Sequence, residues 1–228
     1  MTILAIDTST DILSIAIVKN GKALARFHRK ANRRHSILLV PTIDMLLKKA
    51  GLKIKDIDCF AVSVGPGSFT GLRIGVTVVK GLAFALKKPI VAVPTLDVIA
   101  YNVLSHKGFI CPVLDARKNK VYACLYRSDG KALKRLSKYM LLPMAELLKK
   151  TIKYDKVLFL GDYIEERSFE RSGLSRSQDQ ILLRKIWQPR AGAVARLGAE
   201  QARAKKFVKC EDLEPMYIYS KECDITGK

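Results

Sequence analysis

The sequence predicts an α/β fold that begins with a mixed β-sheet. The chain has 228 residues, of which 49% are hydrophobic, and this is enough for a well-buried core in one large domain or two small ones. Short apolar or alternating runs of strand length open the chain, and segments of helical periodicity then alternate with buried strands. That order is expected of a mixed sheet joined by crossover helices.

Three antiparallel strands are expected at residues 3–7, 13–18 and 23–29. A polar break follows the first strand, and Asn20-Gly21 separates the other two. Asn and Gly tolerate the positive φ values of a tight two-residue turn, so this pair is a strong hairpin signal.

Helices and strands alternate over the rest of the first hundred residues. Apolar side chains recur at helical spacing over residues 36–49, with Lys48 and Lys49 in the last turn and Gly51 just beyond it. This pattern predicts a helix with a clear stop. The next predicted elements are a strand at 59–64, a helix at 70–86, a strand at 90–93 and a helix from 94 towards 104.

A second unit is expected to begin near Gly108, so the chain divides into an N-terminal half at residues 1–106 and a reduced C-terminal half at 107–228. The predicted elements of the second half are a hairpin of 109–115 and 121–127, a weaker strand near Leu136, a helix at 143–150, a strand at 156–160, a polar loop at 165–180, a helix at 191–206 and an extended tail at 214–219. This order partly repeats that of the first half.

The chain is strongly basic. Lys and Arg number 41 against 21 Asp and Glu, which gives a formal net charge of +20, and the densest basic cluster lies at residues 26–35. Such a surface attracts polyanions, and nucleic acid is the commonest of them because each neutralised phosphate releases a counterion. A lysine-rich genome would give the same composition, and the scattered charges leave both explanations open.

The cysteines and the apolar runs indicate a soluble, cytoplasmic protein. The five cysteines are spread out without a Cys-x-x-Cys pair, which favours reduced thiols over a disulfide framework or a zinc site; they are Cys59, Cys111, Cys124, Cys210 and Cys223. The apolar run at 2–18 is interrupted by Asp7 and Asp11 and has no basic leader, unlike a signal peptide. No stretch approaches the roughly 20 apolar residues of a membrane-spanning helix.

The first candidate site is the turn after the first strand, where Asp7, Thr8 and Ser9 follow one another. Small hydroxylated residues at such a turn let backbone N–H groups face a nucleotide phosphate, and an aspartate can hold a metal-bound water. The same residue types also occur in ordinary hairpins because they form turns well. Taken alone, the motif favours the ordinary turn.

The second candidate site is a glycine-rich turn at residues 65–75, between a predicted strand and a predicted helix. It resembles an anion-binding helix N-terminus, where Gly65, Gly67 and Ser68 would line a phosphate, although no Walker lysine follows. Alternatively, the glycines serve a sharp turn, and Gly71 and Gly75 on one helical face admit a close neighbour. Both interpretations stay open at this point.

The histidines do not indicate a metal site or a catalytic triad. His28, His35 and His106 are the only ones, and they lie far apart without ligand spacing. No Gly-x-Ser-x-Gly elbow accompanies them. His35 precedes Ser36 at the predicted start of a helix and is expected to be a capping or interface residue.

Several segments together resemble the family of bacterial tRNA threonylcarbamoyladenosine biosynthesis proteins TsaB, also called YeaZ. The segments that carry the resemblance are 6–9, 34–36 with Leu39 and Pro41, 65–75, 94–96, 114–117, 121–122 and 215–217. They span nearly the whole chain, most densely over residues 1–100.

The resemblance implies an actin-like fold of the actin, Hsp70 and sugar-kinase superfamily, RNase H-like, with two partly duplicated halves of which the second is reduced. It also implies a cytoplasmic complex with the related catalytic subunit TsaD and the ATPase TsaE, which transfers threonylcarbamoyl from an adenylate to an adenosine of tRNA. The metal-binding histidines of the catalytic relatives correspond to Thr95 and Ile99 here, and neither can replace an imidazole. A non-catalytic subunit without a metal or a required cofactor is therefore expected, with room for ATP or ADP near the partner interface.

In this family the helices of the first half form the interface, either with TsaD or with a second copy when TsaD is absent. The residues expected at that interface are His35, Leu38, Leu46, Gly71, Leu72, Arg73, Gly75, Val76 and Val79. The alternative is that the apolar members belong to the core of the same chain. tRNA contact is expected through the complex, without a membrane partner.

Two rival functions remain from the sequence. One is a small enzyme, either an ATP-dependent kinase-like protein or a peptidase. The other is a basic tRNA-binding module, motivated by the net charge of +20.

Overall fold

The computed structural model describes residues 1–163, 180–181 and 186–218, and these fold as two compact units. The first unit consists of Met1–Val98 together with Pro189–Met216, and the second begins at Ile99 and extends to Gln188. The predicted division into 1–106 and 107–228 is thus wrong for the last described helix, which returns to the first unit. Its small residues allow it to pack closely against a sheet face that would otherwise be left uncovered.

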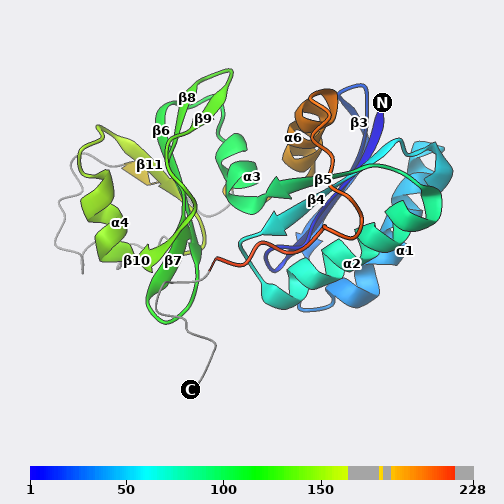
Figure 1. Ribbon diagram of the computed structural model, residues 1–228, viewed down its shortest axis with the longest axis horizontal. Coiled ribbons are helices and arrows are strands. Elements are labelled where there is room, and N and C mark those ends of the chain that lie inside the picture. Colours follow the sequence, from blue (N-terminus) through cyan, green and yellow to red (C-terminus); the bar gives the residue numbers. More distant parts are fainter. Residues whose placement is uncertain (164–179, 182–185, 219–228) are drawn as a thin grey trace. The chain divides into compact units, whose positions relative to one another are not determined.

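The first unit contains a five-stranded mixed sheet in the order β3-β2-β1-β4-β5 (Figure 1). The strands are β1 (Thr2–Asp7), β2 (Ile12–Lys19), β3 (Lys22–Lys30), β4 (Cys59–Gly65) and β5 (Ile90–Pro94). The first three pair antiparallel as predicted, whereas β1, β4 and β5 are parallel. Asn20 and Gly21 form the β2–β3 turn with φ values of 49° and 80°, as their sequence predicts.

Helices cover both faces of this sheet (Figure 1). They are α1 (His35–Ala50) and α2 (Phe69–Leu86) on one face and α6 (Ala191–Arg203) on the other. Helix α3 (Thr95–Tyr101) follows β5, and a short 3₁₀ helix lies at Ile54–Asp56. Large side chains such as Leu4, Ile15 and Phe60 form the core with α1 and α2. On the other face α6 approaches closely, since a Cβ added to Gly198 would lie 2.8 Å from the Cβ of Ala61.

Helix α2 is more apolar than the sequence analysis allowed. Its 18 residues, Phe69–Leu86, have a mean hydropathy of 1.5 and are long and apolar enough to cross a membrane by length and composition alone. One side of the helix is buried in the core of the first unit, whereas Phe84 lies outside that side and is 79% exposed. The mean hydropathy of α2 is high because apolar side chains occur both among its buried and among its exposed residues.

The second unit contains a seven-stranded sheet among the described residues, with the path β10-β7-β6-β11-β12 and with β8 and β9 beside β6. Its elements are β6 (Lys107–Asp115), β7 (Lys120–Ala123), β8 (Tyr126–Asp129), β9 (Leu133–Arg135), β10 (Met140–Pro143), α4 (Met144–Thr151), β11 (Val157–Leu160) and β12 (Gln180–Ile181). The single strand predicted at 121–127 is instead two strands, because β7 pairs with the end of β6 and β8 with its beginning. The loop predicted at 165–180 lies outside the described residues except for Gln180.

The cysteines that the structure describes are free thiols, namely Cys59, Cys111, Cys124 and Cys210. Three of them are buried, and burial raises the pKa of Cys59 to about 11. Cys223 lies outside the described residues. The described cysteines therefore act as small core or near-core side chains.

Candidate functional site

The carboxyl ends of the parallel strands β1, β4 and β5 carry polar side chains, and ligands of open α/β sheets bind at such edges. Asp7 ends β1, Ser63 lies opposite it near the end of β4, and Thr95 follows β5. All three are fully buried. The oxygens Asp7 Oδ2, Ser63 Oγ and Thr95 Oγ1 have no hydrogen-bond partner among the described residues.

Asp7 is held by the turn that follows it. Its Oδ1 accepts hydrogen bonds from the backbone N–H of Ser9 at 3.0 Å and from the Ser9 hydroxyl at 2.9 Å. Burial raises the pKa of the Asp7 carboxyl above its usual range, although neighbouring Ser63 and Ser9 act in the opposite direction. The aspartate therefore stabilises the turn through one oxygen and leaves the other in a water-poor site.

The glycine-rich turn packs directly against the β1 turn. A Cβ added to Gly67 would lie 2.2 Å from Ser9 O, and one added to Gly71 would lie 2.1 Å from Thr8 O. Gly75 meets Thr8 in the same way, at 2.3 Å from its Oγ1. These distances leave no room for side chains, so the glycines permit two backbone segments to touch.

Two N–H groups at the start of α2 are used inside the chain. Ser68 N donates to Ser9 O at 2.7 Å, and Gly71 N donates to Ser68 Oγ at 3.2 Å. An anion at a helix N-terminus needs such groups free and pointing at it. Of the two interpretations left open by the sequence, the structure therefore supports close packing at Gly67, Gly71 and Gly75 over a phosphate cradle.

The row of polar side chains continues across the sheet to β2 and β3, where no sequence pattern predicted it. Asp7 lies opposite Ser14, and Ser14 lies opposite His28. The Ser14 hydroxyl accepts a hydrogen bond from Ala191 N at 2.9 Å and lies 3.1 Å from His28 Nδ1. Ser14 thereby caps the first turn of α6 from a distant strand. The long sequence separation explains why no local pattern revealed this contact.

Most apolar residues expected at the partner interface face the interior instead. Leu46, Leu72, Val76 and Val79 are at most 4% exposed, and all except Leu72 belong to the large core cluster of the first unit, against which the half-buried Leu38 packs. An exposed stripe made of these four side chains was therefore a wrong expectation. The helical period was identified correctly, but it marks the side of the helix that contacts the sheet.

His35 also differs from its prediction. It begins α1 and is buried, but the N-cap residue is Arg34, and no side chain caps the helix. The capping role is therefore wrong, and the His35 Nε2 atom has no partner among the described residues. Thr95 and Ile99, which correspond to the metal ligands of the catalytic relatives, are both fully buried in α3.

Helices α1 and α2 also expose large apolar residues. Five of the eleven exposed large hydrophobic residues in the described part of the chain belong to these two helices, and they are Ile37, Val40, Met45, Phe69 and Phe84. We call these five residues, together with Arg73, the outer face of α1 and α2. The Arg73 guanidinium lies 3.8 Å from the centre of the Phe69 ring, which is a close cation–π contact.

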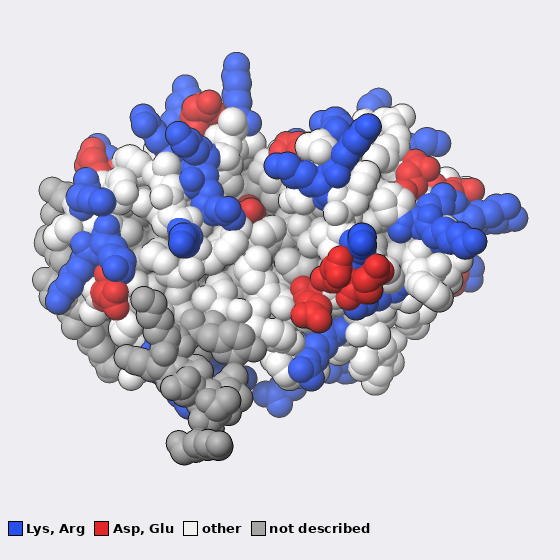
Figure 2. Space-filling model, in the orientation of Figure 1, with Lys and Arg blue, Asp and Glu red and all other residues white. Residues whose placement is uncertain are grey.

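Basic side chains are spread over the visible surface of both units in place of one dense patch (Figure 2). Within the basic segment at 26–35, Arg26, Arg29, Lys30, Arg33 and Arg34 are exposed. Among the described residues no group of three or more His, Cys, Asp or Glu side chains could hold a metal ion.

Comparison with known proteins gives a consistent set of relatives. Residues 27–203 match the family model described as TsaD, tRNA N6-adenosine threonylcarbamoyltransferase. The chain is 39% identical to the tRNA threonylcarbamoyladenosine biosynthesis protein TsaB of Bacillus subtilis over 164 residues, which covers 71% of each protein. It is 28% identical to TsaB of Escherichia coli over 96% of this chain and 94% of that protein.

Solved structures agree in fold. YeaZ from Pseudomonas aeruginosa superposes with a TM-score of 0.80 and 27% identity, covering 95% of this chain and 99% of that one. The ROK hexokinase of Thermus thermophilus superposes with a TM-score of 0.50 and 10% identity, over 89% of this chain and all of that one, which indicates the fold alone. The fold is the actin-like α/β fold that the resemblance implied. By sequence and by structure, the chain belongs to the TsaB (YeaZ) family within the wider TsaD family.

Proposed function

We propose that this chain is a non-catalytic partner subunit in the synthesis of threonylcarbamoyladenosine in tRNA, and that it binds a TsaD-like catalytic subunit. The observation that carries the proposal is the outer face of α1 and α2. Its five large apolar residues are about 49% to 79% exposed and lie on two helices that contact each other. Exposed apolar surface of this kind is typical of protein–protein contacts.

The lack of a catalytic role is supported by the chemistry of the first unit. Thr95 and Ile99 are poor or absent donors for a transition metal, and the turn before α2 is occupied by contacts with the β1 turn. The subunit would act by shape, by presenting a surface to its partner.

A TsaD-like partner is favoured because that family model matches most of this chain. Two related chains can join through equivalent helices around an approximate two-fold axis, and an identical copy can do the same exactly as a homodimer. The outer face would then contact TsaD in the complex and a second copy when TsaD is absent. We propose that a TsaE-like ATPase joins the complex, that tRNA contacts it, and that the assembly is cytoplasmic.

The test is reconstitution of tRNA modification. A TsaD-like subunit, a TsaE-like ATPase and the adenylate-forming enzyme would be combined with ATP, threonine, bicarbonate and unmodified tRNA, with and without this chain. Modified adenosine is expected only in the complete mixture, and none is expected from this chain without TsaD. Full activity in its absence would refute the proposal.

The interface is tested by charge at its two most exposed apolar residues. In the double variant Ile37→Glu, Phe84→Glu we expect loss of co-elution with TsaD on a sizing column, because both residues are more than 60% exposed and their burial against a partner would desolvate a charge. Ile152→Glu in the second unit is the matched control, since Ile152 is 66% exposed. Equal co-elution of the natural chain, the double variant and the control with TsaD would exclude the outer face of α1 and α2 as the interface.

A peptidase function is the second candidate, because one similar solved structure is described as related to the peptidase YEAZ. Ser14 and His28 form a serine–histidine pair at 3.1 Å. Ser14 is only 2% exposed, and its oxygen already accepts the Ala191 N–H, so a peptide carbonyl has no approach to it. We expect no peptide cleavage by the purified chain, and Ser14-dependent cleavage would reverse this conclusion.

A further inference from the structure

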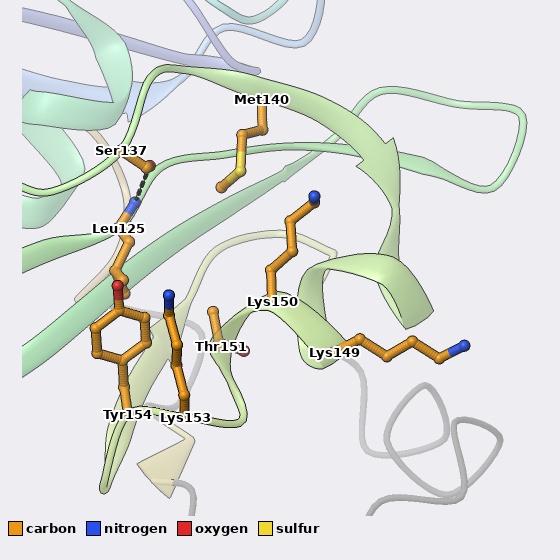
Figure 3. A pocket seen from close by; sticks show the side chains of 8 residues that line it. All are labelled: Leu125, Ser137, Met140, Lys149, Lys150, Thr151, Lys153 and Tyr154. Carbon is orange, nitrogen blue, oxygen red and sulfur yellow. Dashed lines mark hydrogen bonds between the residues drawn. The ribbon is translucent and has the colours of Figure 1, made fainter.

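The second unit contains a cavity of about 360 Å³ beside the C-terminal end of α4 (Figure 3). The residues that line it are Leu125, Ser137, Met140, Lys149, Lys150, Thr151, Lys153 and Tyr154. All of them belong to the second unit, so the cavity is complete within one folded body. Its volume falls within the range of about 300–1,000 Å³ that is typical of small-molecule sites.

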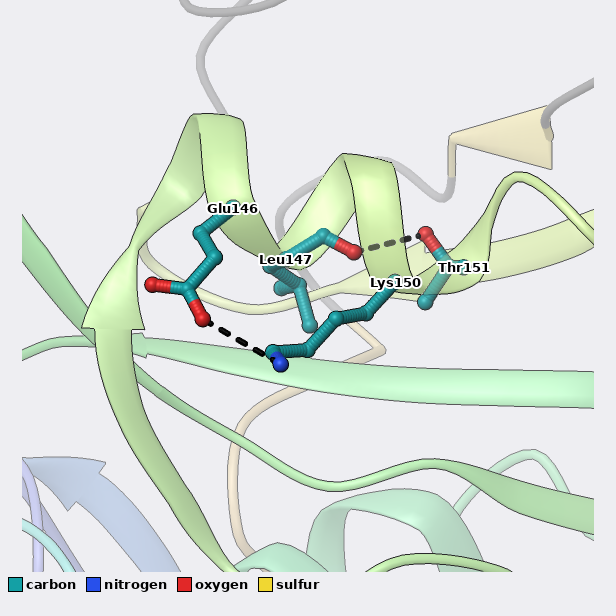
Figure 4. A network of polar contacts seen from close by, with 4 residues as sticks. All are labelled: Glu146, Leu147, Lys150 and Thr151. Carbon is teal, nitrogen blue, oxygen red and sulfur yellow. Dashed lines mark hydrogen bonds and ion pairs between the residues drawn. The ribbon is translucent and has the colours of Figure 1, made fainter.

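Positive charge dominates the polar lining of this cavity. Lys149, Lys150 and Lys153 are the charged residues that line the cavity, and no carboxylate is among the lining residues. In Figure 3 the Lys149 side chain points away from the other lining residues, so Lys150 and Lys153 supply the positive charge at the cavity. Lys150 pairs with Glu146 at 3.2 Å, one helical turn away (Figure 4). Both side chains of that pair are about half exposed, at 53% and 52%, so solvent screens the pair and an incoming anion can compete with Glu146.

The backbone that carries these lysines is well anchored. Met144, Leu147, Leu148 and Thr151 bury the inner side of α4. The Thr151 hydroxyl donates to the Leu147 carbonyl at 3.0 Å (Figure 4), which fixes the last turn. The helix therefore holds Lys149 and Lys150 at fixed positions on its outward side, while their long side chains remain free to adjust.

The rest of the cavity is apolar or aromatic. Leu125 and Met140 contribute apolar surface, and the Tyr154 ring packs against Phe109 with its centre 4.8 Å away and an interplanar angle of 54°. Figure 3 shows the Tyr154 hydroxyl and the Lys153 ammonium pointing to the same side of the cavity. The Lys153 ammonium lies 5.3 Å from the centre of the Tyr154 ring. An aromatic ring is thus placed beside a site for negative charge.

We propose that this cavity binds a nucleotide unit, with its phosphate between Lys150 and Lys153 and its base or sugar against Tyr154, Leu125 and Met140. Lysines beside an aromatic ring are how proteins bind single-stranded nucleic acid, since the cations attract the backbone and the ring stacks with a base. The net charge of +20 would draw such a ligand to the protein. The ligand is either a free mononucleotide or a nucleotide within an RNA strand.

This inference goes beyond the proposed function, because it concerns binding by the chain alone and does not depend on the outer face of α1 and α2. A competing explanation is that Lys149 and Lys150 serve only the negative end of the α4 dipole. That explanation predicts that their replacement lowers stability without affecting any nucleotide or RNA.

The test is binding of the full chain to three probes: adenosine monophosphate, a labelled single-stranded RNA of ten nucleotides, and unmodified tRNA. The charge variant is Lys150→Glu, Lys153→Glu. Its matched control, Lys131→Glu, Lys134→Glu, makes the same change of net charge at exposed positions around β9. Tyr154→Leu removes the aromatic ring, and Tyr154→Phe keeps it. Thermal melting of each variant would confirm that it is folded.

We expect the charge variant to bind the RNA at least about tenfold more weakly than the control. Its slope of log affinity against log salt should be smaller in magnitude by about 1.4, because two phosphate contacts are lost at about 0.7 each. Tyr154→Leu should weaken binding about fivefold or more with an unchanged salt slope, whereas Tyr154→Phe should bind like the natural chain. Pocket-dependent binding of adenosine monophosphate would assign a free nucleotide, and pocket-dependent binding of the longer probes alone would assign an RNA strand. Absence of binding by the natural chain, or equal weakening in the charge variant and its control, would overturn the inference.

Discussion

Replacement of Gly71 by alanine tests the closed turn between β1 and α2 most directly. In a helix interior Gly→Ala ordinarily stabilises by about 1 kcal/mol, because alanine has the higher helix propensity. At Gly71 the new Cβ would lie 2.1 Å from Thr8 O, a backbone atom of a fully buried residue. Since relief requires backbone movement, we take the upper part of the 1–3 kcal/mol range for overpacking, which leaves a net loss of about 2 kcal/mol.

The matched control is Gly81→Ala in the same helix, where nothing lies within 4 Å of the added Cβ. This variant should gain about 0.5–1 kcal/mol, so the two variants should differ by about 3 kcal/mol. Urea unfolding followed by circular dichroism would measure both against the natural chain. If Gly71→Ala were as stable as Gly81→Ala, the turn would be open and the packing explanation of the glycines would be refuted.

Three further substitutions test the first unit. Leu72→Glu should destabilise it by at least about 3 kcal/mol in urea unfolding, because Leu72 is 1% exposed and a charge would be buried without a partner; a stable variant that only fails to assemble would restore the interface role. Because burial raises the Asp7 pKa above 3.8, protonation of Asp7 favours the folded state. The resulting stabilisation is fully present only below pH 3.8 and is lost as the pH rises through the pKa of Asp7 in the folded state. The stability of Asp7→Asn relative to the natural chain should therefore be highest at pH 7 and should fall as the pH falls towards 4. Urea unfolding midpoints of both proteins at each pH would measure this, and a relative stability of the variant that rises at low pH would contradict it. Ser14→Ala should lower the free energy of unfolding by about 0.5–2 kcal/mol because Ala191 N loses its acceptor. The exposed control Ser36→Ala should change it by less than about 0.5 kcal/mol, and equal effects of the two substitutions would contradict the capping role of Ser14.

The fold was predictable where local chemistry and tertiary structure agree. Asn20-Gly21 forces a tight turn in any context, and the alternating apolar segments of the first hundred residues could pack only as strands and crossover helices. The same local reasoning fails for residues 121–127, because the division into β7 and β8 depends on which part of β6 each segment meets. It also fails for α6, whose partner sheet lies more than a hundred residues earlier in the chain.

The candidate site was predictable only in part, because sequence periodicity does not tell which side of a helix faces the sheet. Leu72 and Phe84 lie on the same helix, are both large and apolar, and differ only in direction: one is 1% exposed and the other 79%. Position relative to Gly71 and Gly75 could have separated them. Those glycines mark the edge that meets the β1 turn, and an apolar residue beside that edge must belong to the interior.

The two sides of α2 together argue for a subunit that acts through its surface. On the inner side, Gly71 and Gly75 bring the helix against Thr8, and the first N–H groups are used by Ser9 and Ser68. Part of the helix N-terminus is therefore used within the chain, which leaves fewer N–H groups for a phosphate. On the outer side, the same helix leaves Phe69 and Phe84 exposed. A helix whose N-terminal turn packs against its own chain and which still exposes large apolar side chains is suited to docking against a partner, and its contribution to tRNA modification is then best sought in assembly of the complex.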